Sequence, residues 1–302
     1  MSDHAPDPAV QLKGLKPTRE FFIGLDSDGC VFDSMEIKQK ECFCPNFINS
    51  FGLQAVSKYA RDVWIFVNLY SKSRGCNRFL AVILALDLLR ELPEVAAREV
   101  TVPKMDGLRA WIKLETKLGN PALKMEVERT GDPDLAQVYA WSLAVNESVG
   151  LMVRNVPPFP LVRESLRALE GKADVIVVSQ TPYEALKREW EEHDIDKYIR
   201  LIAGQEMGTK AEHITFATKG KYSEGRVLMV GDAPGDLDAA RKNGALFFPI
   251  NPGHEEASWK RFLGEALIRF FAGTFAGEYE RSLIAEFRSE EHTSELQSLS
   301  HL

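Results

Sequence analysis

The sequence predicts an α/β fold in which a doubly wound, parallel, Rossmann-like sheet forms the core and carries an inserted all-helical cap domain. Two observations support this prediction. From about residue 157 onward, short apolar segments alternate with helical patterns, which is typical of parallel strands joined by right-handed crossovers. Between Ser34 and that point, apolar positions recur at helical spacing and no alternating strand pattern is present.

The first strand is expected in the apolar run that starts at Phe21 and ends at two carboxylates, Asp26 and Asp28. Ligands of such sheets gather at the carboxyl ends of the strands. Side chains two residues apart point to the same side of an extended segment, so both carboxylates can face one site if the strand continues through Asp28. They repel each other unless a cation or a shared proton separates them. The alternative is an Asx turn in which Asp28 and Gly29 serve only as turn residues.

The remaining elements follow from the periodicity of the apolar residues and from the positions of the prolines. In the helical region we expect helices at Val56–Leu69, Phe79–Leu92, Leu108–Leu118 and Leu135–Leu151. Later strands are expected at Asp174–Val178, Leu201–Ala203, Arg226–Val230 and Ala245–Ile250. The helices between and after them are expected at Leu161–Leu169, Tyr183–His193, Lys210–Thr218 and Asp236–Asn243, and from about Glu255.

These elements predict four segments. Residues 1–16 read as a mobile arm, residues 17–34 and 157–287 as the α/β core, and residues 35–156 as the helical cap. Two linkers at 33–35 and 154–160 would let the cap open for substrate and close to exclude water, and a rigid helical subdomain is the alternative. Residues 288–302 read like the translation of a sequencing-adapter oligonucleotide, so we interpret them as a non-native tail and exclude them from the fold.

The composition limits the classes of function. The chain of 302 residues is 45% hydrophobic, which supports a buried core, and its net charge of -7 leaves no basic patch for nucleic acid. No segment resembles a secretory signal or a membrane-spanning helix, so we expect a cytoplasmic protein that does not bind membranes. The four cysteines form no disulfide framework or zinc pattern, so reduced thiols that pack are expected, with a redox role for Cys42 and Cys44 as the alternative.

Two further segments offer groups that suit a phosphoryl ligand. The apolar run before Ser179 ends in hydroxyl groups, and a hydroxyl together with backbone N–H groups at a strand-to-helix turn can bind phosphate oxygens. Ser179 is therefore a candidate catalytic donor and Gln180 a candidate substrate contact, with helix N-capping as the alternative. Lys210 opens a predicted helix, where its ammonium group can neutralise phosphoryl charge, and Lys219 and Lys221 are rival candidates.

A second pair of carboxylates follows the strand predicted at Arg226–Val230. Asp232 and Asp236 lie four residues apart after Gly231. Carboxylate oxygens on a loop suit Mg²⁺, which combines one or two carboxylates with waters and phosphate oxygens. Asp236 has an alternative role as the N-cap of the following helix.

The predicted cap contains a polar, cationic break between two apolar helices. Lys72, Arg74 and Arg78 lie in this break and are candidate substrate contacts, because a cationic segment suits an anionic substrate. The alternative is an ordinary solvated loop between helices.

The segment Asp26-Ser27-Asp28-Gly29, with Asp33-Ser34 behind it, resembles the first motif of the haloacid dehalogenase-like superfamily of phosphatases and phosphotransferases. Ser179 matches its second motif, Lys210 the third, and Asp232 with Asp236 the fourth, over about Phe21–Pro252. The resemblance implies a phosphatase that hydrolyses a small phosphomonoester through an aspartyl-phosphate, with Asp26 as nucleophile and Asp28 as general acid and base. True dehalogenases lack the second Asp, which this chain keeps as Asp28.

The resemblance also implies a Mg²⁺ cofactor, with ligands at Asp26, Asp28 through its backbone carbonyl, and Asp232, and with Asp236 supporting the metal site. Ser179 and Lys210 would hold the phosphoryl oxygens. Three alternatives stay open at this point. They are a phosphomutase that uses the same residues, a phosphonate hydrolase with a Schiff-base lysine at Lys58 or Lys72, and a non-catalytic module that binds phosphorylated ligands.

Overall fold

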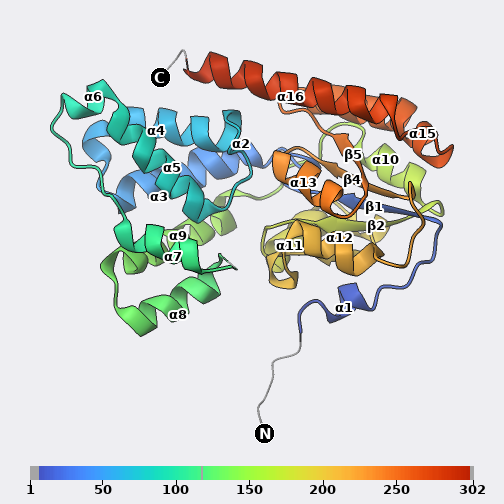
Figure 1. Cartoon of the computed structure of the whole chain (residues 1–302), viewed down its shortest axis with the longest axis horizontal. Helices are drawn as coiled ribbons and strands as arrows, with labels where there is room; N and C mark the ends of the chain where they lie inside the picture. Colours follow the sequence, from blue (N-terminus) through green and yellow to red (C-terminus); the bar gives the residue numbers. More distant parts are fainter. Residues whose placement is uncertain (1–6, 117, 300–302) are drawn as a thin grey trace, which may run out of the picture. The chain divides into compact units, whose positions relative to one another are not determined.

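The computed structural model describes residues 7–116 and 118–299 (Figure 1). The chain divides into two compact units. Among the described residues, the first contains 7–34 together with Asn155–Glu290, and the second contains Met35–Arg154 and 291–299. Within the described ranges, no helix combines the length and the apolar character that crossing a bilayer requires.

The first unit is built on a parallel sheet of five strands, which confirms the predicted α/β fold class. The strands follow the order β3-β2-β1-β4-β5, so β1 lies at the centre. Each of the four later strands begins and ends within one residue of its predicted bounds. The strands are β1 (Phe21–Leu25), β2 (Ala173–Val178), β3 (Leu201–Ala203), β4 (Val227–Gly231) and β5 (Leu246–Pro249).

Helices cover both faces of this sheet, as a doubly wound fold requires. Because side chains alternate along a strand, Ile23 and Leu25 join the apolar core on one face and Phe22 joins the core on the other. On the first face the core includes residues of α10 (Val162–Leu169), α11 (Tyr183–Glu192), α14 (Glu255–Arg261) and α15 (Leu267–Phe271). On the second face it includes residues of α1 (Val10–Lys13), α12 (Lys210–Thr218) and α13 (Pro234–Lys242).

The last helix, α16 (Glu278–Leu299), packs against both cores (Figure 1). Leu283 belongs to the first core and Phe287 to the second. The helix continues past Phe287, so most of the segment interpreted as adapter-derived is helical up to Leu299. Residues 300–302 lie outside the described residues.

The described part of the segment expected as a mobile arm contains regular structure. Residues 7–16 include the short helix α1, and the Leu12 side chain is fully buried in the second core. The few apolar residues of this segment gave no periodic pattern, which is why the sequence reading missed the helix. Its burial depends on contacts with strands and helices far along the chain. Residues 1–6 lie outside the described residues.

A buried carboxylate, Asp174 of β2, ties the segment that follows α1 to the sheet. Its oxygens accept hydrogen bonds from the Thr18 backbone N–H at 2.8 Å and the Tyr222 hydroxyl at 2.7 Å. The Thr18 hydroxyl, the Arg19 N–H and the Arg200 guanidinium also donate to it. Burial alone would raise the pKa of Asp174, but these donors outweigh it and hold the pKa below its ordinary value.

Replacing Asp174 by Asn should therefore destabilise the protein in a pH-dependent way. At neutral pH we expect a loss of about 3 kcal/mol, because donors that met a carboxylate then meet an amide. The folded-state pKa is depressed, so the wild-type advantage is present above the unfolded pKa and is lost as the pH falls below roughly 4. Urea unfolding of both proteins at neutral and acidic pH measures this difference. A gap that stays the same at both pH values would contradict the assignment.

The second unit is helical throughout its described residues. Its principal helices are α3 (Cys44–Ser50), α4 (Ser57–Ile65), α5 (Arg78–Glu91), α7 (Asp106–Leu114), α8 (Asn120–Thr130) and α9 (Pro133–Met152). Shorter pieces are α2 (Met35–Ile37), α6 (Pro93–Ala96), π-helical turns at Lys38–Phe43 and Phe66–Tyr70, and a 3₁₀ turn at Gln54–Val56. The helix predicted over Leu108–Leu118 ends earlier, at Leu114.

Aromatic side chains form the centre of this second unit. Trp64 packs against Phe47, with ring centroids 4.7 Å apart, and against Trp141, with centroids 5.9 Å apart. Cys42 and Cys44 are buried free thiols of the same unit. Burial raises the pKa of Cys44 to about 11, which disfavours the thiolate that redox chemistry needs and agrees with a packing role.

The two chain segments at the ends of the insertion lie side by side in the first unit. Phe32 and Pro158 form an antiparallel bridge, and the Phe159 N–H donates to the Val31 carbonyl at 2.9 Å. The chain therefore leaves the first unit and returns to it at neighbouring points.

Candidate active site

Four predicted site residues come from elements that end or begin at one edge of the sheet. Asp26 follows β1, Ser179 follows β2, Asp232 follows β4, and Lys210 is the first residue of α12. Because the strands are parallel, their carboxyl ends share one edge. The Asp26 N–H still donates to the Val230 carbonyl at 2.9 Å, so the sheet pairing fixes the position of this carboxylate.

The centre of the site is a cluster of three buried carboxylates. Asp26, Asp232 and Asp236 each offer an oxygen, and these oxygens lie within 4.8 Å of one another. The Lys210 ammonium group donates to Asp236 at 2.6 Å and lies 3.0 Å from Asp26. With all four groups ionised, three negative charges and one positive charge leave a net charge of -2.

Burial and mutual repulsion shift the acidities of these groups. Burial raises the pKa of Asp26 well above its usual range, and the charges of Asp236 and Asp232 raise it further, while Lys210 only partly offsets them. Burial likewise raises the pKa of Asp236. For Lys210, burial alone would lower the pKa, but the carboxylates of Asp236 and Asp26 reverse this effect and keep the ammonium charged. A divalent cation would therefore neutralise the net negative charge of the cluster.

Asp236 has a structural role that the sequence did not predict. It is the third residue of α13 and not the N-cap, and its second oxygen accepts a hydrogen bond from the Ala233 N–H at 3.1 Å. Its side chain lies directly over Gly231, where a Cβ atom would be only 2.5 Å from the Cβ of Asp236. Glycine at 231 is therefore required by the close approach of the carboxylate.

The N-cap of α12 explains why Lys210 is held in place. Thr209 is the N-cap of α12, and it forms a capping box with Glu212. The cap fixes the helix start, and with it the first helical residue, Lys210. The rival candidates lie elsewhere, because Lys219 is exposed and the Lys221 ammonium donates to the Lys13 and Phe216 carbonyls.

The Asp28 carboxylate is not part of the three-carboxylate cluster. The strand ends at Leu25, and the chain turns at Ser27, whose carbonyl accepts from the Val31 and Phe32 N–H groups. Gly29 has a φ of 78°, which this turn requires and glycine adopts without strain. The condition that the strand continue through Asp28 is thus not met, and the two carboxylates are separated by a turn.

Two hydroxyl groups hold Asp28. The Thr181 hydroxyl donates to one carboxylate oxygen at 2.7 Å, and the Ser34 hydroxyl donates to the other. The helix α11 begins after Pro182 without a side-chain cap, so the Thr181 hydroxyl does not cap this helix. Thr181 therefore connects the loop after β2 to the loop after β1.

Two tryptophans, which the sequence did not single out, support the loop after β1. The Trp190 indole of α11 donates to the Ser27 hydroxyl at 3.1 Å. The Trp259 indole of α14 donates to the Cys30 carbonyl at 2.8 Å. Both rings are fully buried in the first core. The loop that carries Asp26 and Asp28 is thus fixed by the packing of the unit.

The other predicted contacts are placed as follows. Ser179 is buried at the end of β2, and its hydroxyl accepts from the Thr181 N–H at 3.2 Å. The exposed Gln180 amide donates to the Gly208 carbonyl at 2.9 Å and so binds the chain itself. Lys72, Arg74 and Arg78 belong to the second unit, where Arg74 donates to the Leu69 carbonyl at 3.2 Å and Arg78 is half-buried.

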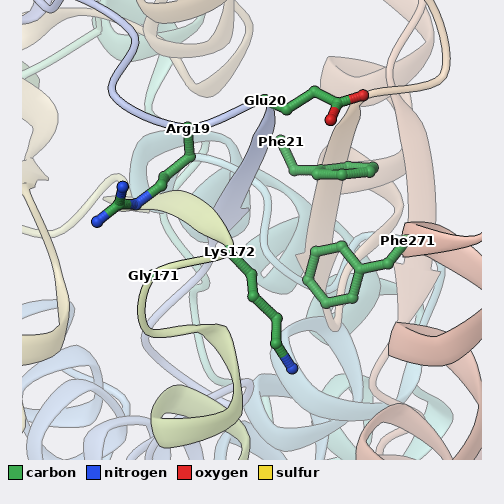
Figure 2. Close-up of a pocket in the computed structure, with 6 residues that line it drawn as sticks. All are labelled: Arg19, Glu20, Phe21, Gly171, Lys172 and Phe271. Atoms are coloured by element: carbon green, nitrogen blue, oxygen red, sulfur yellow. The ribbon is translucent and has the colours of Figure 1, made fainter.

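A pocket of about 420 Å³ lies at the opposite edge of the sheet (Figure 2). It is lined by residues just before β1 and β2, by Phe21 and by Phe271 of α15. The two rings meet edge to face with centroids 4.9 Å apart, and Lys172 extends beside Phe271. Since none of the predicted site residues lines this pocket, it is separate from the carboxylate cluster.

Residues 116–250 match the family model described as haloacid dehalogenase-like hydrolase. No curated protein matches the chain. Among solved structures, a haloacid dehalogenase-superfamily hydrolase from Geobacter sulfurreducens is 16% identical, with 78% of this chain and 89% of that chain covered and a TM-score of 0.40. A haloacid dehalogenase-like family protein from Streptococcus pneumoniae is 13% identical, with coverages of 80% and 90% and a TM-score of 0.44. At these scores no property is transferred from either protein.

The close approach at Gly231 generates a prediction for stability. Gly231→Ala should destabilise the protein by about 2 kcal/mol, because the added methyl group overpacks against Asp236 and disturbs its bonds to Lys210 and Ala233. Gly235→Ala, at the second residue of α13, is the matched control, since its Cβ would meet nothing within 4 Å. Urea unfolding of the three proteins measures both effects. Equal stability of Gly231→Ala and Gly235→Ala would contradict the role given to Gly231.

Proposed function

We propose that this chain, of which residues 116–250 match the haloacid dehalogenase-like hydrolase model, is a Mg²⁺-dependent phosphatase that hydrolyses a small phosphomonoester through an aspartyl-phosphate. The observation that carries this proposal is the buried cluster of Asp26, Asp232 and Asp236 around Lys210. Such a cluster suits a reaction in which negative phosphoryl charge must be neutralised next to a carboxylate nucleophile. A small phosphorylated metabolite as partner and a cytoplasmic location are part of the proposal.

Each proposed role follows from the position of the residue. An Asp26 oxygen forms a bond to phosphorus while the bond from phosphorus to the leaving oxygen breaks, and Asp28 supplies the proton that the leaving oxygen takes up. In the second half, Asp28 removes a proton from water as the water oxygen attacks phosphorus. This releases phosphate and restores the Asp26 carboxylate. The hydrogen bonds from Thr181 and Ser34 orient Asp28 for both transfers.

Mg²⁺ is the proposed cofactor because the donor set is made of carboxylate oxygens and carries net negative charge. Asp26 and Asp232 would bind the ion together with the Asp28 carbonyl, and Asp236 would support the site through Lys210. A bound Mg²⁺ would neutralise charge on the phosphoryl group. Ser179 and Lys210 would hold phosphoryl oxygens.

Phosphate transfer to a sugar hydroxyl would use the same residues and is an alternative outcome of the assay below. Phosphonate hydrolysis would need a Schiff-base lysine. Lys58, one candidate, lies 5.7 Å from the centroid of the Tyr59 ring, which does not single it out for that chemistry. A non-catalytic module that binds phosphorylated ligands is the alternative from outside the enzymes.

The central prediction concerns the nucleophile. The full chain should release phosphate from a panel of small phosphomonoesters when Mg²⁺ is present, and Asp26→Asn should lower the rate by at least about a thousandfold, because an amide cannot form the phosphorylated intermediate. Asp33→Asn, which changes an exposed carboxylate in the same loop, is the control and should keep activity. Equal activity of the two variants would refute Asp26 as nucleophile.

A second prediction tests the metal without an activity readout. Mg²⁺ should raise the melting temperature of the wild type, because it binds the folded cluster and relieves its net charge of -2. Asp232→Asn should abolish most of this shift by removing a ligand, whereas Asp238→Asn on the exposed side of α13 should retain it. The proposal fails if Mg²⁺ stabilises Asp232→Asn as much as Asp238→Asn.

A further inference from the structure

The second unit contains a guanidinium group whose partners in the described chain are all neutral. Arg78 begins α5, and its Nη1 donates to the Ser142 hydroxyl at 3.0 Å and to the side-chain amide oxygen Oδ1 of Asn146 at 2.8 Å. Both partners lie on α9, and the Ser142 hydroxyl in turn donates to Asn120 at 2.6 Å. The guanidinium group also lies over the ring of Phe43, 5.0 Å from its centroid.

Three other arginines of the same unit have carboxylate partners. Arg90 and Arg109 both pair with Asp87, and Arg129 pairs with Glu126. Arg78 has no ion pair with the side chains of residues 7–116 and 118–289. Burial lowers its pKa to about 10, and no carboxylate offsets this effect. A partly desolvated charge without a counter-ion is disfavoured, so this arrangement points to an anion that comes from outside the chain.

The free edge of the guanidinium group indicates the kind of anion. The described residues supply acceptors for Nη1 only, so Nε and Nη2 remain free to donate. Neither of these two atoms is among the fully buried polar atoms that lack a partner, so solvent reaches them. The Nε and Nη2 hydrogens form the fork that binds two oxygens of a carboxylate or a phosphoryl group.

We propose that Arg78, oriented by Ser142 and Asn146 and stacked on Phe43, is an oxyanion-binding site of the helical unit. Its ligand is a carboxylate or phosphoryl group of a small molecule. The assignment of this site does not depend on the proposed phosphatase function.

Nuclear magnetic resonance of the full-length, ¹⁵N-labelled protein tests the site directly. The probes are inorganic phosphate and acetate, which separate a phosphoryl preference from a carboxylate preference. The Nε–Hε signal of Arg78 is assigned by its absence in Arg78→Lys, and we expect it to shift in a saturable way with at least one probe. Arg98 provides the internal control, because its exposed guanidinium also lies over an aromatic ring, 4.9 Å from the Tyr59 centroid.

Lys210→Met separates this site from the carboxylate cluster. Phosphate should bind the cluster more weakly in this variant, whereas the shift of the Arg78 signal should persist. The proposal is overturned by the absence of a saturable shift with both probes, by an equal shift at Arg98, or by loss of the shift in Lys210→Met. If the shift is present but the protein releases no phosphate from any ester, the proposed function fails and the anion site stands.

Discussion

The buried ammonium group of Lys210 is the constraint on which the first unit depends. A charge removed from water is tolerated only with close partners, and here Asp236 lies at 2.6 Å and Asp26 at 3.0 Å. The two carboxylates come from the loop after β1 and from α13, while the lysine comes from α12. The sheet must therefore bring three distant chain segments to one edge before any of these charges is compensated.

The two edges of the sheet use buried carboxylates in different ways. At the amino end of β2, Asp174 is surrounded by donors, which hold its pKa low and make it a structural anchor. At the carboxyl edge, Asp26 and Asp236 share one lysine, and burial raises the pKa of each. The one ammonium group at this edge does not neutralise all of the negative charge of the carboxylates. A site that depends on a cation needs such an excess of negative charge.

Much of the fold could be predicted because it depends on local pattern. Apolar runs that end at polar residues predicted the five strands, and the positions of the prolines predicted the helix boundaries. The candidate residues Asp26, Ser179, Lys210 and Asp232 were identified for the same reason, since each follows a strand or opens a helix. The contacts of Asp28 could not be predicted, because Thr181 reaches it across 153 positions of the chain.

Other features escaped the sequence for similar physical reasons. Trp190 and Trp259 look like ordinary core residues until their indole N–H groups are seen to bind the loop after β1. The helix around Leu12 is stabilised by tertiary burial and is too short to show a period. Arg78 appeared as one of three cations of a predicted loop, whereas its place at the start of α5 and its neutral partners on α9 depend on the tertiary fold.

The most direct test of this account is to identify the phosphorylated residue. A single turnover with a hydrolysable phosphomonoester is quenched in acid, the acyl phosphate is reduced with borohydride, and the peptides are mapped by mass spectrometry. The account predicts homoserine in place of aspartate at position 26. Homoserine at another aspartate, or turnover without any reduced residue, would contradict Asp26 as the nucleophile.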